Sequence, residues 1–225
     1  MVLCCGDFQS LRDEQDLGAL KCPDKFKRLG GFAKYFSREK RAPFLTIFVG
    51  GNHEASNLLR ELYFGGYVAE NIFFLGYSSV VNVSKGPHTL RIAGISGIEK
   101  SHDATKGYIE EYPYVHQYKN LTSMYHIREY EIAKLASLST PVDFMLSHEW
   151  PTLATSHGSY RNNPGFQQLL KYKPYFKKEI MRGELGSPML TCLLESVQPR
   201  VLWCSAHLHC QYRIAMPVGD ALVNF

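Results

Sequence analysis

Four apolar, strand-like runs of this chain each end in Asp, Asn or His, and this pattern constrains the fold more than any other feature. The runs are Val2–Cys5, Phe44–Val49, Val142–Leu146 and Val201–Cys204, followed by Gly6-Asp7, Gly51-Asn52-His53-Glu54, Ser147-His148 and His207-Leu208-His209. In open α/β sheets, binding sites are built beyond the carboxyl ends of the strands. The pattern therefore predicts an α/β fold that gathers these polar groups into one site.

The remainder of the chain alternates short apolar runs with amphipathic stretches, which is typical of α/β proteins. Further strands are expected at Ile72–Leu75, Val80–Val83 and Leu90–Ile95, and helices at Pro23–Arg38, Glu54–Leu62, Thr122–Leu138, Phe166–Met181 and Pro188–Val197. The adjacent Gly30 and Gly31 indicate a break in the first helix. With 225 residues, 45% of them hydrophobic, the chain suits one domain over residues 1–225.

Composition narrows the class of protein. No stretch approaches the roughly 20 apolar residues that span a bilayer, and the sequence MVLCCGDFQ lacks the basic start of a signal peptide. Six cysteines occur without a CxxC pair, which favours a reduced cytosolic or nuclear protein. The net charge of +4 permits a polyanionic substrate without establishing one.

Residues 99–121, EKSHDATKGYIEEYPYVHQYKNL, depart from this pattern because they show no clear periodicity. A loop of this length in a compact domain is usually functional or disordered. Lysine and tyrosine together suit contacts with phosphates and stacked bases. The same composition also suits a solvated loop anchored by aromatic residues, and the sequence does not choose between the two.

The polar residues at the strand ends are the types that bind divalent metal ions. A carboxylate bridges two cations, imidazoles suit Zn, Fe and Mn, and an amide oxygen completes a ligand set without adding charge. Such a centre activates a bound water and clamps phosphoryl oxygens, while a nearby histidine protonates the leaving oxygen. A glutamate following that histidine would orient it. Each residue alone is also explained by an ordinary turn or a buried histidine, so the prediction rests on the set.

These motifs resemble the calcineurin-like metallophosphoesterase superfamily, whose signature runs D-x-H … G-D … G-N-H-[DE] … H … G-H-x-H. The last four blocks match, except that Ala206 replaces the glycine of the final block. Within the superfamily, the chain is similar to the RNA lariat debranching enzymes from residue 3 to about residue 213. The stretches that carry this similarity are CCGDFQSLRDEQDL, FVGGNHEASNLLREL, GGYVAENIFFLG, IAGISGIEKSHD, SMYHIR, FMLSHEWP, LGSP and SAHLH.

The resemblance implies a β-sandwich core flanked by helices and a phosphodiesterase that hydrolyses the 2′–5′ branch of excised intron lariat RNA. It implies one or two divalent ions (Fe, Zn or Mn), a nuclear location with shuttling to the cytoplasm, and splicing-associated partner proteins. It further implies a lariat-recognition insertion over residues 97–128. By position, Asp7 would bridge the metals, Asn52, His148 and His207 would complete one metal site, and His209 would belong to the other. His53 and Glu54 would be catalytic, and RNA contacts would come from Lys100, His102, Tyr125, His126 and Arg128.

The sequence departs from the family at its start, because the Cys-x-His form of the first block has no counterpart. We therefore expect the first strand–helix unit, on the order of thirty residues, and a C-terminal extension to be absent. The chain would then be an isoform, a fragment or an incomplete gene product, and a single-metal enzyme is conceivable. Two alternatives stay open: a general metallophosphatase, and an inactive RNA- or spliceosome-binding protein.

Overall fold

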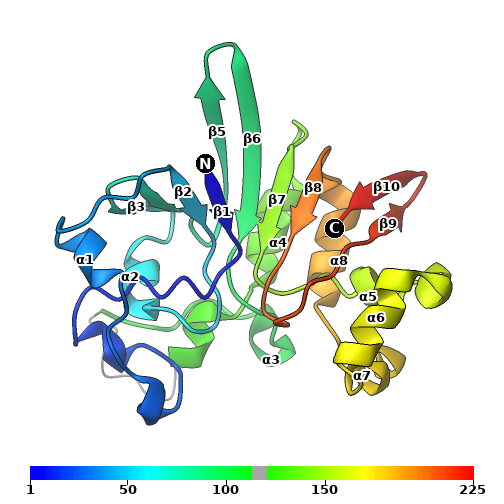
Figure 1. Cartoon of the computed structure of the whole chain (residues 1–225), viewed down its shortest axis with the longest axis horizontal. Coiled ribbons are helices and arrows are strands. Elements are labelled where there is room, and N and C mark those ends of the chain that lie inside the picture. The colour runs from blue at the N-terminus through cyan, green and yellow to red at the C-terminus, as the bar shows by residue number, and fades with distance from the viewer. Residues whose placement is uncertain (113–120) are drawn as a thin grey trace.

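Two four-stranded sheets form the centre of the computed structural model, which describes residues 1–112 and 121–225 (Figure 1). The first sheet has the order β1-β2-β4-β3. Its strands are β1 (Val2–Cys4), β2 (Thr46–Phe48), β3 (Gly66–Ala69) and β4 (Ile72–Phe74). Strands β1, β2 and β4 are parallel, and β3 pairs with β4 in the antiparallel direction. The carboxyl ends of β1 and β2 therefore lie at the same edge.

The second sheet has the order β5-β6-β7-β8. Its strands are β5 (Ser78–Lys85), β6 (His88–Ile95), β7 (Phe144–Ser147) and β8 (Leu202–Cys204). The β5–β6 pair is an antiparallel hairpin that extends beyond its neighbours (Figure 1), whereas β6, β7 and β8 are parallel. A separate antiparallel hairpin of β9 (Ala215–Val218) and β10 (Ala221–Asn224) packs beside β8.

Alternating side chains explain how the two sheets pack. Along β2, Ile47 joins a core cluster that includes Ile92 and Leu146 of the second sheet, whereas Phe48 joins a different cluster with helix residues. Successive side chains of a strand point to opposite faces, so β2 is buried on both. The sheets therefore form a sandwich, with one core between them and one on each outer face. This confirms the predicted α/β fold with packed sheets and flanking helices.

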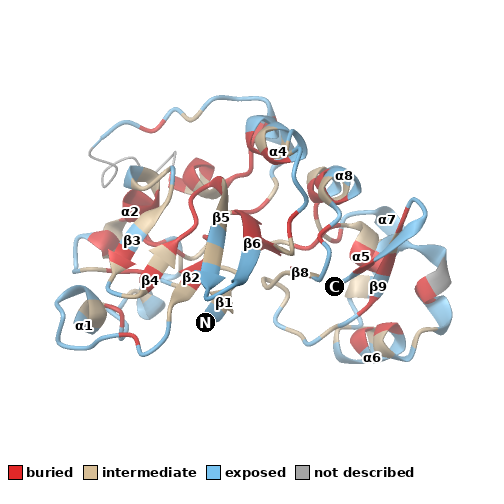
Figure 2. Cartoon of the chain, turned by 90° about the horizontal axis from the view of Figure 1, so that it is seen from above, coloured by how far each residue is buried: buried red, intermediate tan, exposed pale blue. Residues whose placement is uncertain are grey.

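Short helices cover the outer faces of the sheets (Figure 1). The α-helices are α1 (Ala33–Phe36), α2 (Ser56–Glu61), α3 (Ser101–Ala104), α4 (Glu129–Ala136), α5 (Leu153–Ser156), α6 (Pro164–Tyr172), α7 (Phe176–Arg182) and α8 (Pro188–Val197). Turns of 3-10 helix occur at Asp16–Gly18, Asp24–Phe26, Leu121–Tyr125 and Gly158–Asn162. Helix α2 packs on the first sheet through Leu58 and Leu59, and α8 packs on the second through Leu190 and Leu193. Figure 2 shows buried segments in strands of both sheets and on parts of the covering helices, with exposed segments around the periphery.

Three predicted helices are shorter in the structure, and two of the interruptions have a cause in the local sequence. The stretch predicted at Pro23–Arg38 forms only a 3-10 turn and α1, separated by the glycine pair. A 3-10 turn precedes α4 in place of one continuous helix. Pro174 separates α6 from α7, because proline disfavours helical backbone at the residue before it. Strands β3 and β9 were not predicted, whereas β10 coincides with the apolar, strand-like run at residues 221–225. Among the described residues, no helix is long and apolar enough to cross a membrane.

Candidate metal centre

The structure brings four of the predicted metal ligands together at the ends of β1, β2, β7 and β8. The His148 Nε2 atom lies 3.1 Å from Asn52 Oδ1, 3.2 Å from His207 Nδ1 and 3.4 Å from Asp7 Oδ1. Four ligands placed 2.0–2.1 Å from a tetrahedral zinc ion would be separated by about 3.3 Å. Each of the three distances to His148 Nε2 is therefore close to the spacing expected between two ligands of one metal ion.

The hydrogen bonding of His148 leaves its inner nitrogen free to bind a cation. Its Nδ1 lies 2.7 Å from the Cys5 carbonyl oxygen, which can only accept, so Nδ1 carries the proton. The Nε2 lone pair then faces the oxygen atoms of Asn52 and Asp7. Fixing the outer nitrogen of a ligand histidine in this way is typical of metal sites. A divalent cation among these lone pairs would replace their mutual repulsion with attraction.

Burial keeps both central histidines in the neutral form that binds metal. Burial lowers the pKa of His148, and the nearby Asp7 carboxylate opposes this only in part. Burial and then the neighbouring His148 lower the pKa of His207 to about 4. His209 is exposed, and it makes a further, smaller contribution to lowering the pKa of both rings. The residues present therefore fit a divalent metal ion.

Two glycines allow the strand ends to approach this closely. A Cβ atom on Gly51 would lie 2.2 Å from Asp7 Oδ1 and 2.7 Å from His148 Cε1. A Cβ atom on Gly6 would lie 2.3 Å from His148 Nδ1, and Gly6 also has a φ of +98°. The glycine preceding Asn52 is therefore required by the site and is more than a loose turn.

Three of the candidate ligands have left-handed backbone, which is uncommon outside glycine. The φ angles are 52° for Asp7, 63° for His207 and 49° for His209. Such conformations cost free energy and concentrate at functional sites, where the surroundings hold them. Their occurrence at three ligands of one cluster supports a functional role for the cluster.

Glu54 has a different role from the one predicted. Its carboxylate is buried and accepts hydrogen bonds from the backbone N–H groups of Phe8 (2.9 Å), Gln9 (2.7 Å) and Gly51 (3.0 Å). It therefore ties the loop after β1 to the loop after β2. The His53 ring instead donates from Nδ1 to the Lys21 carbonyl oxygen at 2.6 Å. The expectation that Glu54 orients His53 is corrected to a positioning role for the loops.

His53 lies at the edge of the cluster. Its backbone N–H donates to Asp7 Oδ1 at 2.8 Å, which fixes the aspartate carboxylate. Its ring is only partly buried. Because Nδ1 is engaged by Lys21, Nε2 is the nitrogen that can exchange a proton with a ligand.

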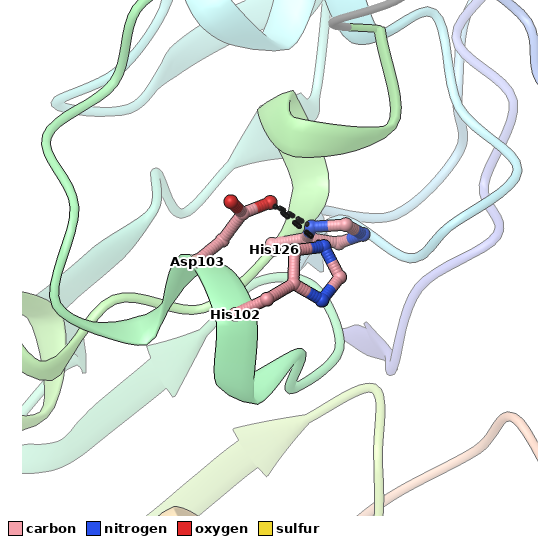
Figure 3. A group of neighbouring side chains, drawn as sticks. All are labelled: His102, Asp103 and His126. Carbon is pink, nitrogen blue, oxygen red and sulfur yellow. Dashed lines mark hydrogen bonds and ion pairs between the residues drawn. The ribbon is translucent and has the colours of Figure 1, made fainter.

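The five predicted RNA contacts divide into surface and interior residues. Lys100 and His102 are exposed, and Tyr125 is half-buried. Burial raises the pKa of Tyr125, and the Asp7 carboxylate raises it further by a smaller amount. His126 and Arg128 are 5% and 2% exposed, so direct RNA contact by these two is corrected to a supporting role. Figure 3 shows the His102 and His126 rings next to each other, with the Asp103 carboxylate directed toward them.

Arg128 and Gly97 hold the predicted lariat-recognition segment from within. The Arg128 guanidinium donates to the Ser123 hydroxyl at 2.6 Å and to the His126 carbonyl oxygen at 3.0 Å, and it stacks over Tyr108. A Cβ atom on Gly97 would lie 2.1 Å from the Tyr125 carbonyl oxygen, so the two ends of the segment touch. Residues 113–120, part of the predicted insertion, lie outside the described residues.

One supporting network next to the centre was not predicted. The Glu149 carboxylate accepts from the Glu99 backbone N–H at 2.6 Å, and the Glu99 carboxylate accepts from the Met189 backbone N–H and the Ser187 hydroxyl at the start of α8. Burial raises the pKa of Glu149 to about 7. Glu99, Glu149 and Ser187 lie in the stretches GIEK, SHEWP and LGSP. Only the joint occurrence of the three stretches could have indicated this network, because no single spacing does.

Two packed sheets with Asp, Asn and His at four strand ends are consistent with a metallophosphoesterase-type α/β fold. No family model matches the chain. The chain is 48% identical over 212 residues to the lariat debranching enzyme of Schizosaccharomyces pombe, covering 94% of this chain and 43% of that protein. Identity to the lariat debranching enzyme of Homo sapiens is 45% over 216 residues (96% and 37%), and to that of Arabidopsis thaliana 43% over 220 residues (98% and 50%).

The chain is thus a relative of the lariat debranching enzymes along nearly its whole length, which confirms the resemblance carried by its motifs. It spans half or less of the length of these curated relatives.

Proposed function

We propose that this chain is a metal-dependent phosphodiesterase that hydrolyses the 2′–5′ branch linkage of lariat RNA. Two independent observations support the proposal. The relatives named lariat debranching enzymes match 94–98% of the chain. The single structural observation that carries the chemistry is the convergence of Asp7, Asn52 and His207 on His148 Nε2.

In this proposal, Asp7, Asn52, His148 and His207 hold a divalent ion, and His209 contributes to a second one. The ligand types suit Fe, Zn or Mn. When bound, such an ion lowers the pKa of a water and neutralises the phosphoryl oxygens during in-line attack. The neutral imidazoles and the single Asp7 carboxylate leave the centre with net positive charge, which favours an anionic phosphodiester.

His53 would act as the proton donor to the leaving oxygen. Its Nδ1 donates to the Lys21 carbonyl oxygen, so the ring is held with Nε2 free to carry a proton. The released ribose oxygen needs a proton, and a positioned histidine typically contributes 10²–10⁴-fold to such a step. The Asp7 contact to the His53 backbone N–H couples the position of the donor to that of the metal ligands.

Substrate recognition is proposed for the surface of the segment over residues 97–128. Tyr125 is half-buried and within electrostatic range of Asp7, whose carboxylate helps to raise its pKa, and Lys100 and His102 are exposed on the same segment. A tyrosine ring suits stacking on a splayed base, and the Lys100 ammonium and the His102 ring N–H suit the flanking phosphates. The substrate class places the proposed activity in the nucleus, with shuttling to the cytoplasm and splicing-associated proteins as further parts of the proposal.

The test is hydrolysis of a short synthetic RNA with one 2′–5′ branch, with a linear 3′–5′ RNA of the same sequence as the control substrate. Cleavage confined to the branch, dependent on Mn²⁺, Fe²⁺ or Zn²⁺ and lost with chelator, supports the proposal. His207→Ala should abolish cleavage, whereas the exposed His88→Ala on the β5–β6 hairpin should not.

The other outcomes identify the alternatives. Equal cleavage of p-nitrophenyl phosphate, with no preference for the branch, would indicate a general metallophosphatase. Tight binding of branched RNA by a folded, metal-loaded protein that leaves the linkage intact would indicate an inactive RNA-binding protein.

A further inference from the structure

A second group of metal-ligating side chains lies outside the proposed catalytic centre. His102 and Asp103 come from α3, and His126 follows the 3-10 turn Leu121–Tyr125, so segments more than twenty residues apart meet here (Figure 3). One ligand atom from each residue lies within 4.8 Å of the other two. We propose that these three residues bind a divalent cation of the zinc class, distinct from the metal of the proposed catalytic centre.

The geometry around Asp103 suits such a cation. Its Oδ2 atom lies 2.7 Å from His126 Nδ1 and 3.4 Å from His102 Nε2. These separations bracket the spacing of about 3.3 Å expected between ligands of a tetrahedral zinc ion. Two imidazoles and one carboxylate are a common zinc ligand set, in which water fills the fourth position.

Burial and charge hold two of the three ligands in the protonation state that binds a metal ion. The His126 side chain is 5% exposed and the Asp103 side chain 12%, whereas His102 is 67% exposed. Burial lowers the pKa of His126, which favours the neutral ring, and the contact with His126 lowers the pKa of Asp103 to about 2, which keeps the carboxylate ionised. The exposed His102 would close the site from the solvent side and leave the fourth position open to water.

Two cationic side chains lie near the proposed site, and one of them competes with a metal ion for the Asp103 carboxylate. The Lys106 ammonium lies 3.0 Å from Asp103 Oδ1, the oxygen that does not contact the histidines. Arg128 is close to His126 but directs its guanidinium to the Ser123 hydroxyl and to backbone carbonyl oxygens. Lys106 therefore withdraws electron density from the same carboxylate, and its removal should strengthen metal binding.

The consequence of the site is local order in the segment that borders the catalytic centre. His126 directly follows Tyr125, whose ring lies near Asp7. A cation shared by α3 and His126 would fasten the two arms of this segment together. The bound ion would thus stabilise the position of Tyr125 without touching the reacting phosphate.

The experiment counts bound zinc and needs no RNA, so its outcome is independent of the proposed function. Zinc stoichiometry and affinity are measured by equilibrium dialysis and calorimetry on the wild-type chain and on Asp7→Asn/His207→Ala, which lacks the catalytic ligands. In both backgrounds His102→Ala should lose about one zinc equivalent, or bind it at least about 100-fold more weakly. His102 is exposed, so its replacement leaves the buried core intact.

Two further variants sharpen the test. The exposed His88→Ala is the matched control and should retain the full zinc count. Lys106→Ala should bind the second zinc more tightly and show a larger rise of Tm with zinc. The same zinc count in wild type and in His102→Ala, or weaker binding in Lys106→Ala, would overturn the proposal and leave a His126–Asp103 hydrogen bond only.

Discussion

Replacing Gly51 with alanine tests the packing at the proposed metal centre more directly than removing a ligand. The new Cβ atom would lie 2.2 Å from Asp7 Oδ1, 2.5 Å from the Asp7 backbone nitrogen and 2.7 Å from His148 Cε1. Contacts below 3.0 Å are essentially never made by real Cβ atoms, so something must move. Two of the three clashing atoms belong to Asp7, and one of those is backbone. We therefore expect the loop after β1 to move away from the loop after β2.

The size of the effect follows from the displacement. Restoring an ordinary contact of about 3.4 Å requires Asp7 Oδ1 to shift by roughly 1 Å. A misplacement of that size costs on the order of 10²-fold in rate, and overpacking a well-packed site costs about 1–3 kcal/mol of stability. The same shift would break the bonds from Glu54 that hold the two loops together.

The assay compares Gly51→Ala with Gly31→Ala. A Cβ atom on Gly31 would meet no atom within 4 Å, so this variant introduces the same chemical change without a clash. Urea unfolding gives the stability and calorimetry with Zn²⁺ or Mn²⁺ gives the metal affinity. Gly51→Ala should bind metal about 10–100-fold more weakly, while Gly31→Ala should match the wild type. Wild-type metal affinity in a folded Gly51→Ala protein would refute the reasoning that this close approach builds the site.

Three other outcomes are expected. His53→Ala should lose about 10²–10⁴-fold in branch cleavage with unchanged metal affinity, as measured by single-turnover kinetics and calorimetry; wild-type cleavage would remove His53 from the mechanism. Chelation of the metal should lower the Tm of the wild type more than that of Asp7→Asn, read by thermal unfolding, because only the wild type holds the ion with a full ligand set; equal Tm shifts would place the ion elsewhere. Burial raises the pKa of Glu54 to about 7, above its ordinary 4.5, so the folded metal-free protein binds this proton more tightly than the unfolded chain. Its contribution to stability is then complete below pH 4.5 and lost as the pH rises to about 7, and urea titrations of Glu54→Gln should lack this loss.

The sequence by itself determined the strands that carry the site. Apolar runs ending in Gly6-Asp7, Gly51-Asn52, Ser147-His148 and His207 are local patterns, and the structure has a strand beside each of them. Two of the four, β2 and β7, are central strands that are largely buried, whereas β1 and β8 lie at sheet edges, and each run is apolar enough to be marked by hydrophobicity. The short edge strand β3 and the strand β9 lack so continuous a run, and they were missed.

Tertiary contacts decided which polar residues serve the site and which serve the framework. Glu54 stands next to His53 in the sequence, yet its carboxylate turns inward to three backbone N–H groups. Arg128 and His126 share a stretch of polar residues with exposed neighbours, yet both are buried. Residue type and spacing state which chemistry a side chain offers. Burial and hydrogen-bond partners, which come from segments far along the chain, determine whether a ligand can reach it.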